Sequence, residues 1–291
     1  MIAGIDGGGT STRLGLRRED NTGAERMKFG PFNISAIGPE GVRKVIGEIA
    51  ARTDLSALSR VCVGGAGASC AGLGSLLEET MGAYGFHGRL RVCTDSEIAL
   101  RGAMEGPGGI LIAGTGSIAW GMNGEGKTVR VGGWGHLIDD EGSGYTIGRD
   151  ALRAAVRTQD GRAEAETLRS AVLARIGGKD NHSILDYVYY SGRDKSATAA
   201  LASVVIGLAG EGDPVSLRIL EKNADELAGL ARAMAAGLGM DRPRVALLGG
   251  LLETENPYSE MVKNKLRAVC ETAAPEHDAL WGAAQLAREM D

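Results

Sequence analysis

The sequence has no excess of positive charge, no long hydrophobic run and few cysteines. Its net charge is −5 at pH 7, which argues against the basic surface typical of nucleic-acid binding. No apolar run is long enough to span a membrane, and the first residues lack the basic and long apolar segments of a signal peptide. We therefore expect a cytoplasmic protein that binds neither membranes nor nucleic acids.

The four cysteines do not form a C-x-x-C motif; they are Cys62, Cys70, Cys93 and Cys270. Zinc sites and redox-active pairs commonly use that close spacing, and disulfides are rare in the cytosol. We therefore expect these cysteines to be free, buried thiols.

Glycine, by contrast, is abundant. It contributes 46 of the 291 residues, about twice its usual share of roughly 7%. The glycines form clusters without a Gly-X-Y period, so we expect them to mark turns that closely approach other groups. The rest of the composition, 43% hydrophobic and 24% charged, is typical of a globular protein, and the length allows two domains.

Apolar strands alternate with segments of helical periodicity along the chain. Strands are predicted within 2–30, with turns at 6–9 and 19–23, and at 61–63, 90–94, 108–113, 118–122, 128–131 and 245–248. Helices are predicted at 39–52, 73–84, 96–104, 145–158, 163–176, 183–190, 195–210, 214–238, 257–271 and 277–289. This order indicates a layered α/β fold. A boundary near 103–108 gives an N-terminal domain of 1–104, completed by a final helix (276–291), and a C-terminal domain of 105–275.

The first motif follows an apolar strand at the start of the chain. Asp6 comes before three glycines, and hydroxyl side chains follow at Thr10, Ser11 and Thr12. Glycine turns let backbone N–H groups approach an anion, and a neighbouring carboxylate can hold hydrated Mg²⁺. A plain hairpin is the alternative, because Leu14-Gly15-Leu16 resumes a strand.

Two further glycine motifs follow predicted strands. Gly114-Thr115-Gly116-Ser117 offers adjacent N–H groups and two hydroxyls to phosphate oxygens. Leu247-Leu248-Gly249-Gly250 would let a flat ring lie on the backbone. Taken alone, each motif is equally typical of an ordinary turn.

One segment matches a phosphate-binding loop only by its letters. Gly121–Thr128 fits the pattern G-x-x-x-x-G-K-[ST], but such a loop must open a helix so that the helix N-terminus faces the phosphates. Asn123-Gly124 instead indicates a hairpin, and Val129 to Gly133 does not begin a helix. We predict a hairpin here.

A dense polar block lies in the middle of the chain. Gly132-Gly133-Trp134-Gly135-His136 precedes Asp139-Asp140-Glu141-Gly142-Ser143. Clustered carboxylates are costly to arrange for structure alone, and paired carboxylates suit sugar hydroxyls. One of Asp139, Asp140 and Glu141 is also a candidate N-cap for the helix at 145–158. His136 is interpreted as a hydrogen-bonded structural histidine.

A single carboxylate, Asp95, follows the predicted strand at 90–94. The carboxyl ends of strands in α/β sheets border the crevice where ligands bind, which favours a catalytic role. The alternative is that Asp95 is the N-cap of the helix that begins at Ser96.

In this order the motifs resemble those of N-acetylglucosamine and glucosamine kinases. The matching segments are Asp-Gly-Gly-Gly-Thr, Thr-Asp, Gly-Thr-Gly-Ser, Gly-Gly-Trp-Gly-His and Asp-Glu-Gly-Ser. These kinases belong to the actin–hexokinase superfamily. They share the BadF/BadG-type family with ATPases that activate benzoyl-CoA reductase and hydroxyacyl-CoA dehydratase. The last two segments are the most specific, because the glycine motifs indicate only ATP.

The resemblance implies an α/β fold of two ribonuclease-H-like, actin/hexokinase-type domains with ATP and sugar in the interdomain cleft. It implies that the phosphates and adenosine of ATP contact Asp6, Gly7, Gly8, Gly9, Thr10, Ser11, Thr12, Gly114, Thr115, Gly116, Gly249 and Gly250. Asp6 would hold Mg²⁺ through water. The implied sugar contacts are Asn33, Gly67, Asp95, Gly133, Trp134 and Asp140, and Asp95 matches the catalytic base.

The activity implied is ATP-dependent phosphorylation of the 6-hydroxyl of N-acetylglucosamine or glucosamine, in a homodimer. Asp95 would orient that hydroxyl and accept its proton late, while Mg²⁺ and the backbone donors stabilise the phosphoryl charge. The first alternative is an ATPase activator, but its bridging iron–sulfur cluster requires a cysteine pattern that is missing. The second is a non-catalytic sensor of sugar or nucleotide, against which Asp95 argues. A repressor-related sugar kinase is disfavoured because the chain has no Cys-rich zinc motif.

Overall fold

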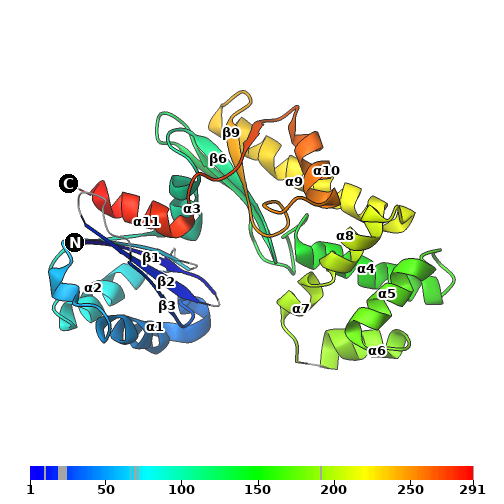
Figure 1. Ribbon diagram of the computed structural model, residues 1–291, viewed down its shortest axis with the longest axis horizontal. Coiled ribbons are helices and arrows are strands. Elements are labelled where there is room, and N and C mark those ends of the chain that lie inside the picture. The colour runs from blue at the N-terminus through cyan, green and yellow to red at the C-terminus, as the bar shows by residue number, and fades with distance from the viewer. Residues whose placement is uncertain are drawn as a thin grey trace. The chain divides into compact units, whose positions relative to one another are not determined.

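The structure, a computed structural model, describes residues 1–9, 11–18, 25–65, 67–68, 70, 72–190 and 192–290, without the side chain of Ser35. It divides into two compact units (Figure 1). Unit 1 comprises Met1–Gly106 and Pro275–Asp291, and unit 2 comprises Pro107–Ala274. Each unit is built on its own five-stranded sheet.

The sheet of unit 1 has the order β3-β2-β1-β4-β5. Its strands are β1 (Ile2–Gly7), β2 (Thr12–Arg17), β3 (Glu25–Phe29), β4 (Arg60–Gly65) and β5 (Arg89–Thr94). The first three strands are antiparallel neighbours, whereas β4 and β5 run parallel to β1. The parallel strands place three carboxyl ends at one edge.

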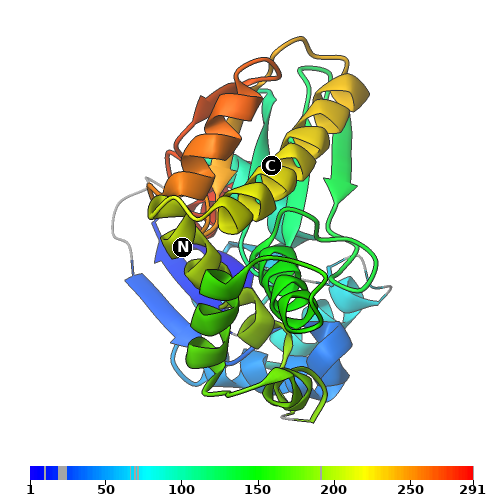
Figure 2. The ribbon, with the colours of Figure 1, turned by 90° about the vertical axis from the view of Figure 1, so that its right-hand side faces the viewer.

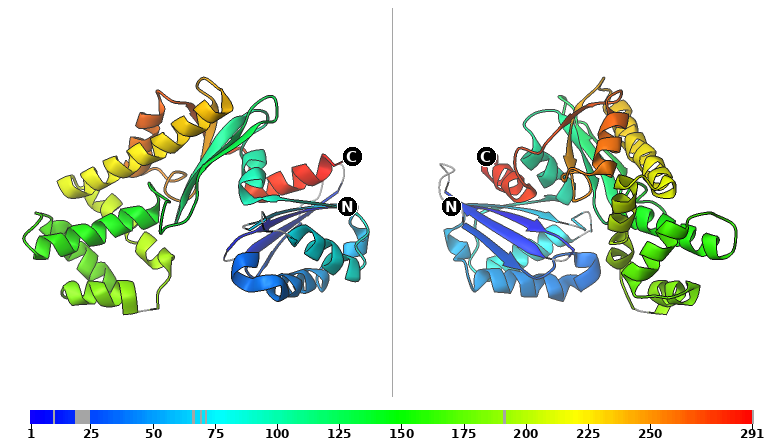
Figure 3. Two further views of the ribbon diagram at one scale, coloured as in Figure 1. Left: turned by 180° about the vertical axis from the view of Figure 1, so that it is seen from behind. Right: turned by 45° about the vertical axis from the view of Figure 1, so that its right-hand side comes forward.

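Helices cover both faces of this sheet (Figure 3). They are α1 (Ile34–Ala50), α2 (Leu73–Ala83), α3 (Asp95–Ala103) and α11 (Ala279–Arg288), with a short 3₁₀ turn at Leu55–Ala57. Side chains alternate across a strand. Ala3 and Ile5 accordingly share a core with α1 and α2, whereas Ile2 packs with α3 and α11. The last helix of the chain therefore completes the fold of the first unit.

The sheet of unit 2 has the order β10-β9-β6-β7-β8. Its strands are β6 (Gly108–Ala113), β7 (Ser117–Met122), β8 (Thr128–Gly132), β9 (Arg244–Leu248) and β10 (Glu271–Ala273). Here β6, β7 and β8 are antiparallel neighbours, and β9 and β10 run parallel to β6. The long helix α9 (Pro214–Leu238), yellow in Figure 2, packs on β7 and β8.

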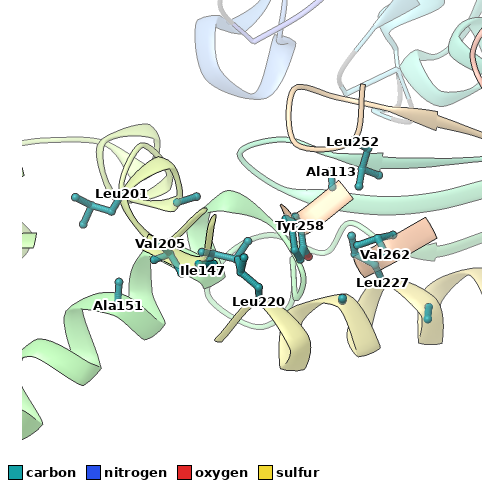
Figure 4. Packing of buried hydrophobic residues seen from close by; sticks show 14 of the residues in the cluster. Ala113, Ile147, Ala151, Leu201, Val205, Leu220, Leu227, Leu252, Tyr258 and Val262 are labelled. Atoms are coloured by element: carbon teal, nitrogen blue, oxygen red, sulfur yellow. The ribbon is translucent and has the colours of Figure 1, made fainter. Parts of the chain in front are cut away.

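The remaining helices of unit 2 form a large helical segment. They are α4 (Gly144–Gln159), α5 (Glu166–Ile176), α6 (Asn181–Leu185), a π-helical turn at Asp186–Tyr190, α7 (Lys195–Ala199), α8 (Ala202–Gly210) and α10 (Pro257–Leu266). Their apolar faces join one core, whose buried members include Tyr258 of α10, Leu227 of α9 and Leu252 (Figure 4). This core includes residues of β6 and β9, the two strands that precede the Gly114–Gly116 and Gly249-Gly250 turns.

Most predicted elements are present, and the differences have local causes. The helix predicted at 39–52 is preceded by a helical turn from Ile34, because Gly38 at φ 68° bends the chain ahead of Pro39. The helix predicted at 257–271 ends at Leu266 instead. The three residues of β10 pair with β9, and so short a strand has no readable period. The turn predicted at 19–23 lies outside the described residues.

The hairpin predicted in place of a phosphate-binding loop is confirmed. Strands β7 and β8 pair antiparallel on either side of it. The Asn123 side-chain oxygen accepts hydrogen bonds from the backbone N–H groups of Glu125 (3.0 Å) and Lys127 (2.9 Å). The expectation of buried thiols holds for three cysteines but is wrong for Cys70, which is exposed.

No helix in the described part of the chain is long and apolar enough to cross a membrane by itself. By length and composition alone, one pair passes the test, Lys195–Gly210 with Pro214–Leu238, and it is bent by 119°.

Candidate functional site

In unit 1, three parallel strands bring polar groups to one edge of the sheet. Gly7 at the end of β1 pairs with Gly65 of β4, which in turn pairs with Thr94 of β5. Asp6 lies one residue before the end of β1, and Asp95 directly follows β5. The two carboxylates are close enough for the charge of Asp95 to raise the pKa of Asp6.

The first glycine turn is held by backbone contacts. Gly8 N–H donates to the Ser11 carbonyl (3.0 Å), and the Gly8 carbonyl accepts from Phe32 N–H (2.9 Å). A β-carbon at Gly7 would lie 2.5 Å from the Phe32 ring, so this position requires glycine for packing. Around Gly9 no atom lies within 4 Å of such a carbon in the described structure, so the turn is open there. Thr10 lies outside the described residues.

Two residues beside this turn that are predicted to contact ATP or sugar, Thr12 and Asn33, also make hydrogen bonds within the fold. The buried Thr12 hydroxyl donates to the Gly30 carbonyl (2.6 Å), so it joins two chain segments. The Asn33 carbonyl accepts from the N–H groups of Ala36 (2.8 Å) and Ile37 (2.9 Å), which starts α1. Asn33 thus follows Phe32, the residue that contacts the glycine turn.

Asp6 is paired with an arginine across the strands. Arg13 lies opposite Asp6 on β2 and donates from Nε (3.0 Å) and Nη2 to the same oxygen, Oδ2. Arg13 also approaches Asp278 (3.6 Å), which pairs with Arg26 (2.7 Å). Burial raises the pKa of Asp6, the Arg13 hydrogen bond and charge lower it, and the charges of Asp95 and Asp278 raise it again.

This donor set fits a hydrated Mg²⁺. Because both Arg13 bonds end on Oδ2, the other oxygen of Asp6 has no donor among the described residues. Mg²⁺ keeps several waters and commonly binds through one or two carboxylates together with substrate phosphates. Asp6 satisfies that requirement, and the described residues contain no cluster of three His, Cys, Asp or Glu side chains that would form an all-protein metal site.

Asp95 is the first residue of α3 and is exposed. The helix cap is Thr94, whose hydroxyl accepts from Glu97 N–H (3.2 Å), so the alternative that Asp95 is the cap is wrong. Asp95 Oδ1 accepts from Ser96 N–H (2.9 Å), which holds the carboxylate at the helix start. Its Oδ2 has no donor in the described part of the chain.

The loop after β4 contributes Gly67 to the same unit. Gly67 has φ 85°, and its carbonyl accepts from Cys70 N–H (2.8 Å). Ala68 N–H donates to Gly65 at the strand end (3.1 Å). These bonds keep Gly67 next to the carboxyl end of β4.

In unit 2, the turn Gly114–Gly116 joins β6 to β7. Gly114 N–H donates to the Gly116 carbonyl (2.9 Å), while Gly144 N–H of α4 donates to the Gly114 carbonyl (2.8 Å). Tyr145 N–H donates to the Thr115 carbonyl (3.3 Å). The N–H groups of Thr115 and Gly116 have no acceptor among the described residues, so they remain for an anion.

The second pair of glycines lies beside this turn. Strands β6 and β9 are parallel and Ile112 pairs with Leu248, so Gly249 directly follows the paired ends. Gly249 has φ 90°, and a β-carbon there would clash with the backbone of Ala113. Its N–H donates to Oε1 of Glu253 (3.0 Å). Gly250 has no atom within 4 Å of its would-be β-carbon in the described structure, so its surface is open.

Asp140 lies against the Gly114–Gly116 turn. The residue is 4% exposed and has φ 62°. Its Oδ1 accepts from Ser117 N–H (3.4 Å), and a β-carbon at Gly116 would lie 2.8 Å from its Oδ2. The predicted N-cap among Asp139, Asp140 and Glu141 is wrong, because Ser143 caps α4 through Thr146 N–H (3.3 Å).

Two residues that the sequence analysis did not single out, Asn223 and Tyr258, form hydrogen bonds with the segment between Asp140 and Thr146. Asn223 of α9 accepts at Oδ1 from Gly142 N–H (3.2 Å) and from the Thr146 hydroxyl (2.9 Å). The Tyr258 hydroxyl of α10 donates to the Gly142 carbonyl (2.6 Å), and burial raises the pKa of this hydroxyl. Both residues occupy buried positions of amphipathic helices, so the sequence carries no separate signal for them.

The neighbouring loop presents Trp134, which is 67% exposed. The backbone N–H of Trp134 donates to Asp139 Oδ2 (3.0 Å). The Arg130 guanidinium lies over the Trp134 ring, 4.6 Å from the ring centroid. Gly133 has φ 74°, and a β-carbon there would lie 2.8 Å from the Ile118 side chain. His136 meets the edge of Tyr145 (4.7 Å between ring centroids), so the contact observed is aromatic.

Comparison with known proteins places these features in a family. The profile of the BadF/BadG/BcrA/BcrD ATPase family matches residues 3–287. The chain belongs to this family. It is 36% identical to an N-acetylmuramic acid/N-acetylglucosamine kinase of Clostridium acetobutylicum, over 99% of this chain and 98% of that protein. It is 28% identical to a glucosamine kinase of Vibrio cholerae, over 86% of this chain and 84% of that protein.

Solved structures of other proteins have a fold similar to that of this chain. A Chromobacterium violaceum protein, provisionally named an N-acetylglucosamine kinase, has a TM-score of 0.76 and 27% identity over 98% of both chains. A ROK family glucokinase from Streptomyces griseus, in complex with glucose and AMPPNP, has a TM-score of 0.61 and 18% identity over 99% of both chains. The predicted α/β fold class and the family resemblance are confirmed, and the roles of individual site residues stay predictions.

Proposed function

We propose that this protein transfers the γ-phosphoryl group of ATP to the 6-hydroxyl of an amino sugar, N-acetylglucosamine or glucosamine. The observation that carries the proposal is the placement of Asp6 and Asp95 at one sheet edge in a chain so similar to amino-sugar kinases. The Clostridium relative is also named for N-acetylmuramic acid, which adds a sugar acid to the candidate acceptors.

The exposure of Asp95 directly after β5 supports its role as the general base. The 6-oxygen forms a bond to the γ-phosphorus, the bond from that phosphorus to the β,γ-bridging oxygen breaks, and ADP leaves. The hydroxyl proton passes to Asp95 late in the step, because a sugar hydroxyl is too weak an acid to ionise first. Asp95 is held by Ser96 N–H at one oxygen, so its other oxygen can orient the hydroxyl. Asn33 and Gly67 are the further sugar contacts that we propose in unit 1.

Asp6 is the residue of unit 1 that would hold Mg²⁺, through water. When bound, the ion would neutralise charge on the transferring phosphoryl group. Arg13 holds the Asp6 side chain in place, and its hydrogen bond and charge oppose the rise in the Asp6 pKa that burial causes. The open turn Gly7–Gly9 and Ser11 form the phosphate contacts that we propose here, together with Thr10.

Unit 2 supplies backbone donors and one buried carboxylate, Asp140. The unused N–H groups of Thr115 and Gly116 suit phosphate oxygens, and the open surface at Gly250 suits the flat adenine ring. We propose that Gly133, Trp134 and Asp140 contact the sugar. Asp140 lies directly against Gly116, which supports the proposal that its buried side chain lies between the sugar and the phosphates.

We propose that the protein acts in the cytoplasm on small molecules and forms a homodimer, as the family resemblance of its motifs implies. The activator alternative gains no support from the cysteines, because three of the four are buried and cannot share a surface cluster. The exposed Asp95 favours a catalyst over a sensor.

The test is ADP release, coupled to an optical readout, over a panel of hexoses, hexosamines and N-acetylmuramic acid with ATP and Mg²⁺. We expect the highest kcat/KM for an amino sugar and a product phosphorylated at O6, identified by phosphorus NMR. The 6-deoxy analogue of the best sugar is the matched control, because it binds alike but has no acceptor oxygen. ADP release that is equal with and without sugar would contradict the proposal.

A further inference from the structure

The loop that carries Trp134 is anchored by one cation. Arg130 of β8 donates from Nη2 to the Gly133 carbonyl (2.6 Å) and from Nε to the Gly132 carbonyl (3.2 Å). Its guanidinium stacks over the Trp134 ring. Gly132 and Gly133 both have positive φ, at 77° and 74°, a backbone conformation that favours glycine. The guanidinium is therefore held in one place although the residue is exposed.

This cation has no carboxylate partner within the described residues. Asp139, one of the acidic side chains of the same loop, accepts instead from the backbone N–H of Trp134 (3.0 Å). The two bonds to backbone carbonyls use the N–H of Nε and one N–H of Nη2. Both N–H groups of Nη1 of Arg130 therefore remain available as donors. A guanidinium with unused donors in a fixed orientation is suited to bind a carboxylate.

We infer that Arg130 is a specificity-determining residue that lets the acceptor site take amino sugars bearing a carboxylate. The inference rests on the proposed function, because it assumes that Trp134 and Gly133 contact the sugar. N-acetylmuramic acid differs from N-acetylglucosamine by a lactyl ether, whose carboxylate would bind the Nη1 side of Arg130. The neutral sugar lacks that contact.

The test compares kcat/KM for N-acetylmuramic acid, its methyl ester and N-acetylglucosamine in the wild type and in Arg130→Gln. The ester keeps the bulk of the lactyl group without its charge. A charge-assisted hydrogen bond is lost, so the ratio of acid to neutral sugar should fall about 10- to 100-fold in the variant. Activity toward N-acetylglucosamine should fall less, through looser stacking of Trp134.

Two further variants separate charge recognition from loop support. Trp134→Leu should lower activity toward both sugars and leave their ratio unchanged. Arg218→Gln removes an exposed cation on α9 and should change neither activity. An equal loss toward both sugars in Arg130→Gln would overturn the inference, because it would show a purely supporting role.

The wild type gives the remaining outcomes. If it phosphorylates N-acetylglucosamine but not the acid, or prefers the methyl ester to the acid, the inference is wrong and the proposed function stands. If it phosphorylates glucosamine but neither of these two sugars, the inference is wrong and the proposed function stands. If it phosphorylates none of the three, the proposed function fails and the inference fails with it.

Discussion

The two sheets of the molecule share one topology but differ in what they present. In unit 1, β1 is flanked by antiparallel β2 and parallel β4; in unit 2, β6 is flanked in the same way by β7 and β9. Glycine turns follow both central strands, at Gly7–Gly9 and at Gly114–Gly116. The topology thus provides a glycine-rich backbone turn twice.

The side chains at equivalent positions are different in chemistry. The fifth residue of β1 is Asp6, which pairs with Arg13, whereas the fifth residue of β6 is Ile112, which pairs with Ile118. Unit 2 has a carboxylate near its turn, but it is Asp140 from a loop outside the sheet. The comparison teaches that one topology can carry an ion pair on one sheet and an apolar pair at the equivalent position of the other, so the backbone turn recurs while the side-chain chemistry does not.

The largest expected effect concerns Asp95, the carboxylate that directly follows β5 in unit 1. Asp95→Ala should lower kcat at least about 10²-fold, because general-base assistance contributes about 10²–10⁴-fold. Binding of an ATP analogue, measured by calorimetry, should be kept. Glu105→Gln, an exposed carboxylate that follows α3, is the control. Near-normal turnover of Asp95→Ala would remove the chemical distinction between the units.

The next effect tests the close backbone approach in unit 2. Gly249→Ala should cost about 1–3 kcal/mol from its φ of 90° alone, and the clash with Ala113 adds to that. Thermal unfolding should show a lower Tm, whereas Gly250→Ala should change Tm little because its surroundings are open. Equal Tm values for the two variants would mean that the β6 and β9 ends are not packed as described.

A smaller effect is expected at Tyr258 of α10, whose hydroxyl donates to the Gly142 carbonyl in the loop before α4. Tyr258→Phe removes the donor to the buried Gly142 carbonyl, which should cost about 1–2 kcal/mol. At about 2–4 °C per kcal/mol for a unit of this size, the change in Tm is measurable. Tyr189→Phe, at a residue 72% exposed, is the control and should leave Tm unchanged. The same Tm for both would argue against a supporting role for Tyr258.

The smallest effect concerns the ion pair that distinguishes β1 from β6. Burial raises the pKa of Asp6 and Arg13 lowers it, so Arg13→Gln should raise that pKa further. Metal binding needs the ionised carboxylate, so activity is lost as the pH falls through this pKa. The acid limb of kcat/KM for Mg-ATP should therefore lie at higher pH in the variant than in the wild type. An acid limb at lower pH in Arg13→Gln would contradict the assignment.

Local signals predicted most of the elements and the hairpin at Gly121–Thr128, because Asn123-Gly124 and the alternating strands act over a few residues. Longer-range contacts were not predictable. Gly7 is required by the nearby Phe32 ring, and the Thr12 hydroxyl donates to the Gly30 carbonyl. Each of these partners lies well away along the chain, where no spacing rule applies.

The sequence by itself determined the α/β class, the glycine turns and the family, because these depend on local composition, periodicity and ordered motifs. Only the tertiary structure decided which groups meet. It placed Asp6 beside Arg13, put the Asp140 carboxylate against Gly116, and engaged Asn223 and Tyr258 with Gly142. The physical reason is that strand register and helix packing set these distances, and both result from burial of the whole core.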